Sequence, residues 1–157
     1  MPLAQWPLGL GVIGLSVVLS SMPAFLPTDA VRMAAGAFEG PVRADVIEVI
    51  DGDTFRAAAH IWLAQTVEVH VRIDGIDAPE LHAKCTTERL KAEVARGWLE
   101  RRIGNSEVRL IGVKNDKYGG RIRASVEDSN GDIAKAMLRQ GLVRAYHGGR
   151  RAGWCNN

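Results

Sequence analysis

Residues 66–73 place the strongest constraint on the fold, because apolar and polar side chains alternate along most of their length. Successive side chains of a β-strand point to opposite faces, so this two-residue period is typical of a strand with one buried and one exposed face. Shorter apolar runs predict four more strands, at residues 46–50, 54–61, 107–113 and 121–127. We therefore expect a fold built mainly from five strands.

A helix is expected at residues 86–103, between the third and fourth strands. Apolar residues recur there at helical spacing and predict one buried stripe, made of Leu90, Val94, Trp98, Leu99 and Ile103. Either Thr86 or Thr87 is the expected N-terminal cap. A second, short helix is expected at residues 132–140, and Gly141 ends it.

This order of elements predicts an α+β fold that is mostly β. Three strands that meander, one long helix, two returning strands and a short C-terminal helix favour a small closed barrel. A sandwich or an open sheet also fits the pattern. At 157 residues the chain is long enough for one domain with its own core and leaves little for a second.

The N-terminal region differs from the rest in composition. Its first 28 residues contain no charged side chain, and residues 8–26 form a 19-residue apolar run, close to the ~20 residues of a helix that spans a bilayer. We interpret residues 1–27 as an export signal or a membrane anchor, residues 28–41 as a linker and residues 42–157 as the folded domain. The protein is then exported: secreted, periplasmic or membrane-anchored. If Met33 is the true first residue, the protein is cytosolic instead.

Charge and cysteine content bear on the partner and the compartment. All 18 acidic residues precede residue 133, whereas the residues after it carry five basic side chains and no acidic one. A basic end suits an anionic partner such as nucleic acid, although a pair like Arg150 and Arg151 is also typical of a solvated tail. Cys85 and Cys155 are expected to form a disulfide in an exported chain and to remain free thiols in the cytosol.

Charged residues gather where the expected strands end. Asp53 follows the first strand, and Asp77 and Glu80 follow the third, which itself contains Arg72. If these strands are neighbours, Asp53 and Asp77 can converge on one cation, and an all-oxygen ligand set points to Ca²⁺ or Mg²⁺ rather than zinc or copper. With Glu80 to hold a water and Arg72 to bind a phosphate, the set suits phosphodiester hydrolysis. Each residue taken singly is more typical of a surface turn.

Four segments of the sequence resemble the staphylococcal nuclease, or thermonuclease, family. They are VIDGDTF (49–55), VRIDGIDAPE (71–80), DKYGGR (116–121) and AMLRQGLVRAY (136–146). They occur in the family's order and at suitable spacing across about residues 44–155. The resemblance implies an OB-type five-stranded barrel and a nuclease of DNA and RNA that depends on Ca²⁺, with Mg²⁺ the less favoured ion.

The resemblance also implies roles for residues in the first two segments. Asp53 and Asp77 correspond to the family's metal ligands. Glu80 corresponds to its general base or water-orienting group, and Arg72 to an arginine that contacts the phosphate. Asp51 is either a further carboxylate behind the metal ligands or a cap for backbone donors in the Asp-Gly-Asp turn.

The last two segments supply the substrate contacts that the resemblance implies. The family's second phosphate arginine directly follows a Tyr-Gly pair, but a second glycine intervenes here. We expect this arginine to be Arg121, with Arg123 as the alternative. Lys117, Tyr118 and Tyr146 fall where the family contacts its nucleotide, and bases can stack on such rings.

The sequence therefore predicts an exported, monomeric, metal-dependent nuclease that acts on DNA, RNA or both, with membrane contact through its N-terminal segment if that segment is retained. One alternative is an OB-type module that binds nucleic acid without hydrolysing it. Another is a membrane-tethered structural domain, which needs neither metal nor phosphate ligands. Trp62, Trp98 and Trp154 are expected to pack inside the fold rather than to stack on bases.

Overall fold

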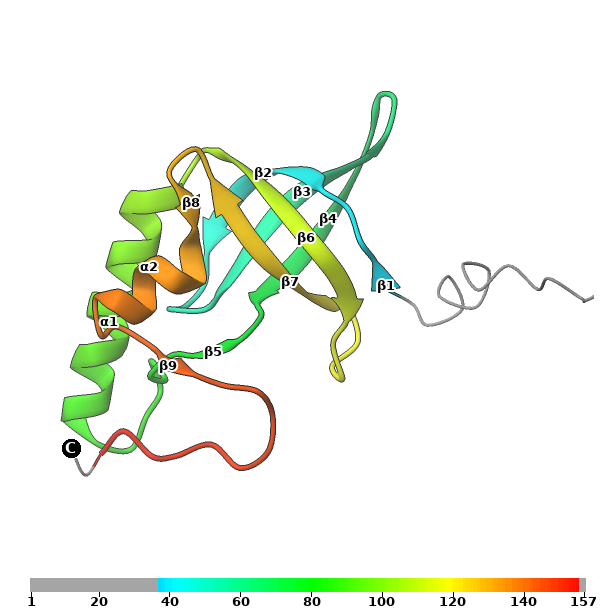
Figure 1. The fold of residues 1–157 in the computed structure, drawn as a ribbon. Coiled ribbons are helices and arrows are strands. Elements are labelled where there is room, and N and C mark those ends of the chain that lie inside the picture. The colour runs from blue at the N-terminus through cyan, green and yellow to red at the C-terminus, as the bar shows by residue number, and fades with distance from the viewer. Residues whose placement is uncertain (1–36, 156–157) are drawn as a thin grey trace, which may run out of the picture.

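The computed structural model describes residues 37–155. The predicted export signal or anchor at residues 1–27, and most of the predicted linker, lie outside this part of the chain. None of the described helices is long and apolar enough to cross a membrane. The described residues form a strand-rich body with both helices on one side (Figure 1).

Five long strands close into a barrel (Figure 1). They are β2 (Val42–Val49), β3 (Thr54–Trp62), β4 (Gln65–Ile73), β6 (Glu107–Asn115) and β7 (Arg121–Asp128). Strands β2, β3 and β4 form an antiparallel meander, and β4 pairs in parallel with β7. Strand β6 closes the ring because it pairs antiparallel with both β7 and β2. The mostly β fold with a five-stranded barrel of OB type is therefore confirmed.

Four two-residue strands add to the barrel. Strand β1 (Ala37–Phe38) pairs with β6, and β8 (Gly131–Asp132) pairs with β7. Strand β5 (Ile76–Asp77) pairs with β9 (Arg144–Ala145). The sequence does not predict these short strands, and β1 falls inside the range interpreted as a linker. The β5–β9 pair matters for function, because it brings the C-terminal segment of the chain beside Asp77.

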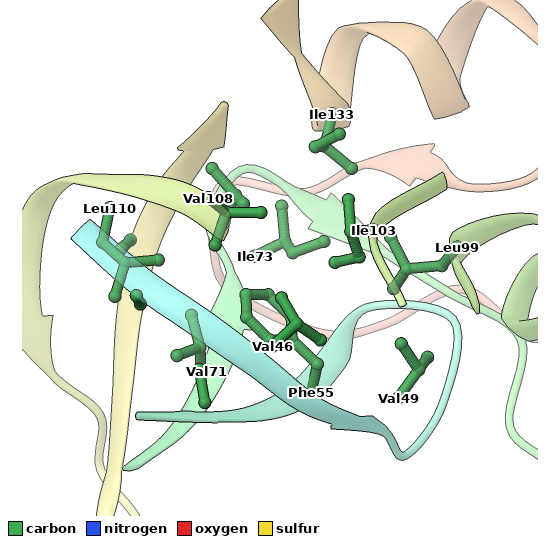
Figure 2. Close-up of a cluster of buried hydrophobic side chains, with 14 of the residues drawn as sticks. Val46, Val49, Phe55, Val71, Ile73, Leu99, Ile103, Val108, Leu110 and Ile133 are labelled. Carbon is green, nitrogen blue, oxygen red and sulfur yellow. The ribbon is translucent and has the colours of Figure 1, made fainter. Parts of the chain in front are cut away.

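The barrel encloses one hydrophobic core (Figure 2). The inward-facing residues of β3 are buried, as their alternation predicts: Phe55, Ala57 and Ala59. In β4, Val71 and Ile73 are fully buried, whereas Val67 is 43% exposed. The apolar residues of β4 therefore face the core in its second half only, because β7 pairs with β4 only from His70 onward.

Helix α1 (Thr86–Ile103) has the predicted bounds but buries only part of the predicted stripe. Its buried apolar residues are Ala92, Ala95, Leu99 and Ile103. The expectation for Leu90 and Val94 is wrong, since they are 57% and 58% exposed. Small alanines let the helix lie close to the barrel, and this close approach turns the larger pair outward. The N-terminal cap is Cys85, without a side-chain hydrogen bond, rather than Thr86 or Thr87.

The start of the second helix and the burial of three tryptophans can also be compared with the sequence-based expectations. Helix α2 (Ile133–Arg139) begins after Asp132, whose side chain accepts a hydrogen bond from the backbone N–H of Lys135 at 2.9 Å. Trp98 packs against the core and Trp154 is buried, as expected. The expectation for Trp62 is wrong: it ends β3 and is 74% exposed.

Leu99 and Leu90 provide a matched test of the face that α1 buries. Leu99→Ala should lower the free energy of unfolding by about 3 kcal/mol, because it leaves a cavity in a packed core. Leu90→Ala removes the same atoms from an exposed site and should change the free energy by less than about 0.5 kcal/mol. Urea denaturation of both variants measures the difference. Equal losses would contradict the packing described here.

Candidate active site

Two chain reversals bring the acidic residues of the site together. Asp53 directly precedes β3 and lies beside the end of β4, where the backbone N–H of Ile73 donates to the Asp53 carbonyl at 2.8 Å. After β4 the chain turns at Gly75, whose φ of 82° favours glycine, and enters β5, which contains Asp77. The ends of β3, β4 and β5 therefore meet at one end of the barrel.

Gly52 allows helix α1 to approach the turn that carries Asp53. A Cβ atom at position 52 would lie 2.9 Å from the Cβ atoms of both Ala78 and Ala95. Ala78 directly follows Asp77, and Ala95 lies on the buried face of α1. The turn, the residue after Asp77 and the helix are thus packed directly against one another, so a side chain at position 52 would push them apart.

Arg72 joins the two aspartates at the centre of the site. Its Nη1 donates to Oδ1 of Asp53 at 2.6 Å, and its Nη2 lies 3.8 Å from Oδ1 of Asp77. Its side chain is only 10% exposed. Asp53 also accepts hydrogen bonds from Oγ1 of Thr54 at 2.9 Å and from the backbone N–H of Ala78 at 3.1 Å. The two predicted metal ligands therefore lie around one guanidinium.

Asp77 contacts residues from distant parts of the chain. The indole Nε1 of Trp154 lies 3.4 Å from its Oδ2 and donates a long hydrogen bond to it. Nε of Arg151 lies 2.9 Å from its Oδ1. That Oδ1 is buried and has cations nearby, yet within residues 37–155 it accepts no well-directed hydrogen bond. Asp77 therefore has an oxygen with unused hydrogen-bonding capacity, and Arg151 lies beside that oxygen.

Glu80 lies at the rim of the site. Its side chain is 57% exposed, and its Oε1 contacts Nη1 of Arg151. Its backbone N–H donates to Oε1 of Glu88 in α1 at 3.3 Å. Arg151 thus bridges Glu80 and Asp77. The sequence does not predict this contact, because there Arg151 belongs to a basic tail that suits either an anionic substrate or solvent.

Three arginines lie on the same face of the barrel wall. Strands β4 and β7 are parallel neighbours, and Arg72 is the partner of Arg123 in their register. Arg121 lies two residues earlier on β7, so its side chain emerges on the same face. Nε of Arg121 donates to Asp116 at 2.5 Å, and Nη1 of Arg123 donates to Asp74 at 3.3 Å. Both candidates for the second phosphate arginine therefore reach the site.

A cavity of about 820 Å³ opens in front of these arginines. The predicted site residues in its lining are Asp51, Arg72, Glu80, Lys117, Tyr118, Arg121, Arg123 and Tyr146. Arg151 lines it too, while Asp53 and Asp77 are buried and lie outside its lining. The guanidinium of Arg121 and Nζ of Lys117 lie 4.8 and 4.9 Å from the ring centre of Tyr118. The cavity thus combines cations with an exposed aromatic ring.

Asp51 satisfies both interpretations that the sequence leaves open. Its Oδ1 accepts a hydrogen bond from the backbone N–H of Asp53 at 2.9 Å, as in a capped turn. It also lines the cavity. Its charge acts on Asp53, whose pKa is raised to about 7 first by burial and then by Asp51. Arg72 and the hydrogen bonds from Ala78 and Thr54 oppose this rise.

Two other groups at the cavity have perturbed pKa values. Burial raises the pKa of Asp116, but the hydrogen bonds from Arg121 and from the backbone of Lys117 outweigh it, so the net change is downward. Burial lowers the pKa of Arg151, but the charges of Asp77 and Glu80 outweigh it and raise the pKa above its ordinary value. Both groups therefore stay charged at neutral pH.

The oxygen donors of the site fit a hard cation. Burial and the neighbouring Asp51 make the charged form of Asp53 costly, so a cation that neutralised it would be favourable. Among the described residues, a single group of three His, Cys or acidic side chains has ligand atoms within 4.8 Å of one another: Cys85, Glu88 and Cys155. The sulfur atoms of that group are bonded to each other, so it is no metal site. A cation at the candidate site would have two carboxylates and complete its shell with backbone oxygens and water.

The C-terminal segment is fastened beside the site by a disulfide. Cys85 and Cys155 are bonded, as expected for an exported chain, with their Cα atoms 5.8 Å apart. The guanidinium of Arg144 lies 3.8 Å from the ring centre of Trp154 and donates to the carbonyl of Gly153 at 3.0 Å. These contacts hold the segment that presents Arg151 to Glu80 and Asp77.

Sequence reasoning misses two residues of this site, Arg151 and Trp154. Their position results from the disulfide and the β5–β9 pairing, which join segments about 70 residues apart. The useful signal in the sequence is that both lie within four residues of Cys155. A predicted bridge to Cys85, itself five residues after Glu80, places them near the site.

Reducing the disulfide should destabilise the protein. The bonded residues are separated by 70 positions, and a loop of that size contributes about 4 kcal/mol in the chain-entropy model, as an upper value. Urea unfolding with and without dithiothreitol measures the loss. The double variant Cys85→Ser/Cys155→Ser should unfold at the same urea concentration as the reduced protein. Dithiothreitol should not change the unfolding of this variant. An unchanged transition in fully reduced protein would contradict a stabilising role.

Known proteins are similar to this chain over half of its length or more. The model of the family described as "Staphylococcal nuclease homologue" matches residues 70–153. "Probable endonuclease lcl3" of Penicillium rubens is 31% identical over 129 residues, which cover 64% of this chain and 44% of the relative. "Probable endonuclease lcl3" of Botryotinia fuckeliana is 39% identical over 83 residues, which cover 50% of this chain and 31% of the relative.

The family match contains most of the residues brought together above. It runs from the second half of β4 to the segment before Trp154 and spans more than half of the chain. The chain covers less than half the length of the two curated relatives. On the strength of the barrel, the site and this match, the chain belongs to the staphylococcal nuclease family.

Proposed function

We propose that this protein is a metal-dependent nuclease that hydrolyses phosphodiester bonds in DNA, RNA or both, and that its ion is Ca²⁺ rather than Mg²⁺. One observation carries the proposal: Arg72 contacts both Asp53 and Asp77 beside a cavity lined by Arg121 and Arg123. This combination suits the hydrolysis of a phosphodiester, because negative charge grows on the phosphate oxygens in the transition state. The relatives' printed names, "probable endonuclease", support the same class of activity.

Each residue of the site has a task that its surroundings support. Asp53 and Asp77 would hold the ion, which supplies Lewis-acid stabilisation of a phosphoryl oxygen when bound. Arg72, fixed by its buried contacts, would donate hydrogen bonds to the phosphate. Glu80 is exposed at the cavity, so it can accept a proton from an attacking water.

The wall of the cavity would bind the nucleotide next to the reacting phosphate. Tyr118 is 57% exposed and can stack on a base or sugar. Tyr146 donates its hydroxyl hydrogen to the carbonyl of Gly149 at 2.8 Å, which fixes its ring at the cavity. Lys117 adds positive charge for the backbone of the nucleic acid.

A module that binds nucleic acid without hydrolysing it fits the site less well. Such a module needs cations and aromatic rings, but it has no use for buried carboxylates. Asp53 and Asp77 are 3% and 5% exposed, and charges so buried are costly unless they are paired. Because binding alone gives no reason to retain them, we favour the enzyme.

We further propose that the protein is exported, that residues 8–26 attach it to a membrane where that segment is retained, and that it works as a monomer. The disulfide supports an oxidising compartment, where such bonds persist. The absence of charge in residues 1–28 supports contact between that segment and a bilayer.

Nuclease assays on single- and double-stranded substrates test the proposal. Activity should disappear in chelator and return with millimolar Ca²⁺. Arg72→Ala and Glu80→Ala should each lower turnover by about 10²- to 10³-fold, as the loss of one placed charge typically does. Arg109→Ala and Glu107→Ala remove the same types of side chain from surface ion pairs and should leave turnover unchanged.

The same assays separate the two candidates for the second phosphate arginine. We expect Arg121→Ala to be as damaging as Arg72→Ala and Arg123→Ala to be milder. If Arg123→Ala lowers turnover more than Arg121→Ala does, Arg123 is the second phosphate arginine. Circular dichroism must show that each variant is folded. Full activity in chelator, or full activity of Glu80→Ala, would contradict the proposed enzyme.

Arg151 should compete with the ion for the carboxylates. Its guanidinium contacts Asp77 and Glu80, so it must release Asp77 before that carboxylate can bind a cation fully. Arg151→Gln should therefore bind Ca²⁺ up to about fivefold more tightly, since partly exposed ion pairs are worth up to about 1 kcal/mol. Isothermal titration calorimetry measures this affinity.

The exposed neighbour Arg150 supplies the control for this measurement. Arg150→Gln removes the same charge from the same segment and should change the affinity by much less. An equal gain in both variants would show a general charge effect and contradict competition by Arg151.

A further inference from the structure

The hairpin between β3 and β4 extends beyond the strands that flank it. Strand β2 pairs with β3 as far as Ala59, and β7 pairs with β4 only from His70 onward. Residues 60–69 are therefore paired mainly with each other across the hairpin. Figure 1 shows the hairpin projecting from the barrel, away from α1, β5 and β9.

The tip of this hairpin is apolar, which is unusual for an exposed turn. Ile61, Trp62 and Leu63 are 55%, 74% and 86% exposed, so no segment within residues 37–155 covers them. Residues 61–67 contain no charged side chain. Consecutive exposed apolar residues favour aggregation unless they serve a contact, so these side chains indicate a binding surface.

The size and shape of the tip favour a lipid surface over a folded protein. Three side chains offer on the order of a few hundred Å² of apolar area, whereas a stable protein interface needs roughly 800 Å² on each partner. A tryptophan beside two aliphatic residues suits the boundary between lipid headgroups and acyl chains. Asp45 pairs with the flanking His60, and Glu68 with Arg56, so the hairpin carries no basic cluster that would require anionic lipid.

The rest of the chain brings a bilayer within reach. The uncharged apolar run ends at residue 26, and residues 27–36 separate it from β1. Ten extended residues span at most about 35 Å, so a barrel attached to a segment in a bilayer stays close to that surface. A projecting apolar tip can then enter the bilayer without any long-range attraction.

We propose that Ile61, Trp62 and Leu63 insert into the surface of a neutral bilayer and form a second membrane contact of this protein. The inference rests on membrane attachment of residues 8–26 and not on nuclease activity. Thr54 lies eight positions before Trp62 on the same strand, a separation of about 26 Å along the strand at 3.3 Å per residue. The contact therefore leaves the cavity, at the other end of these strands, open to nucleic acid.

Tryptophan fluorescence of the full chain in phosphatidylcholine vesicles tests the insertion. The emission of Trp62 is obtained by subtracting the emission spectrum of Trp62→Phe from that of the wild-type protein. We expect this component to shift to shorter wavelength and to lose most of its intensity when the acyl chains carry bromine. Leu63→Glu should abolish the quenching, because it places a charge at the inserting tip.

Leu90→Glu is the matched control, since Leu90 is an exposed leucine on α1. This variant should keep the quenching of Trp62. Leu63→Glu should still float with the vesicles through residues 8–26 and should still cleave a short oligonucleotide at the wild-type rate.

A Trp62 component that bromine does not quench would overturn the proposal. If acrylamide then reaches Trp62, the tip is free in water. If acrylamide does not reach it, a protein surface covers the tip instead. Wild-type chain that fails to float would also overturn the proposal, whether or not the chain is a nuclease.

Discussion

The buried group of Arg72, Asp53 and Asp77 is the interaction on which the rest of the site depends. Charges removed from water persist only when they are paired, and here each partner comes from a different segment: the turn before β3, the end of β4 and β5. The barrel brings these three chain segments together, so that the charges of the group are paired. The cavity, its tyrosines and its outer arginines lie in front of this group.

The alternation and spacing of apolar residues were sufficient to predict the five long strands and the bounds of α1. The expected approach of Asp53 and Asp77 was conditional on neighbouring strands, and in the structure both residues contact Arg72. Alternation marks the buried residues of β3 because Phe55 and its neighbours face one core. It fails at Val67, since β4 continues past the strands that would cover it. In α1 the apolar pattern predicts only part of the buried face. Leu99 and Ile103 are buried as expected, whereas Leu90 and Val94 are exposed, because the first part of the helix packs through Ala92 and Ala95, with Ala95 close to Gly52.

The parts of the site that sequence could not predict depend on contacts between distant segments. Arg151 looks like one of several basic residues near the end of the chain, and Trp154 looks like an ordinary packing residue. Both reach Asp77 because a short strand pair and a disulfide fold the segment back. The choice between Arg121 and Arg123 has the same origin, since the parallel register of β4 and β7 presents both on one face.

The bond between Cys85 and Cys155 also decides how the protein would respond to a protease. Residues 147–150 are exposed and contain two consecutive glycines followed by an arginine, a favourable place for cleavage. In an open chain, such a cut would release everything that follows. Here the severed piece would remain covalently attached through Cys155, with Trp154 still packed beside Asp77. A cut in this loop would thus leave the C-terminal segment at the site.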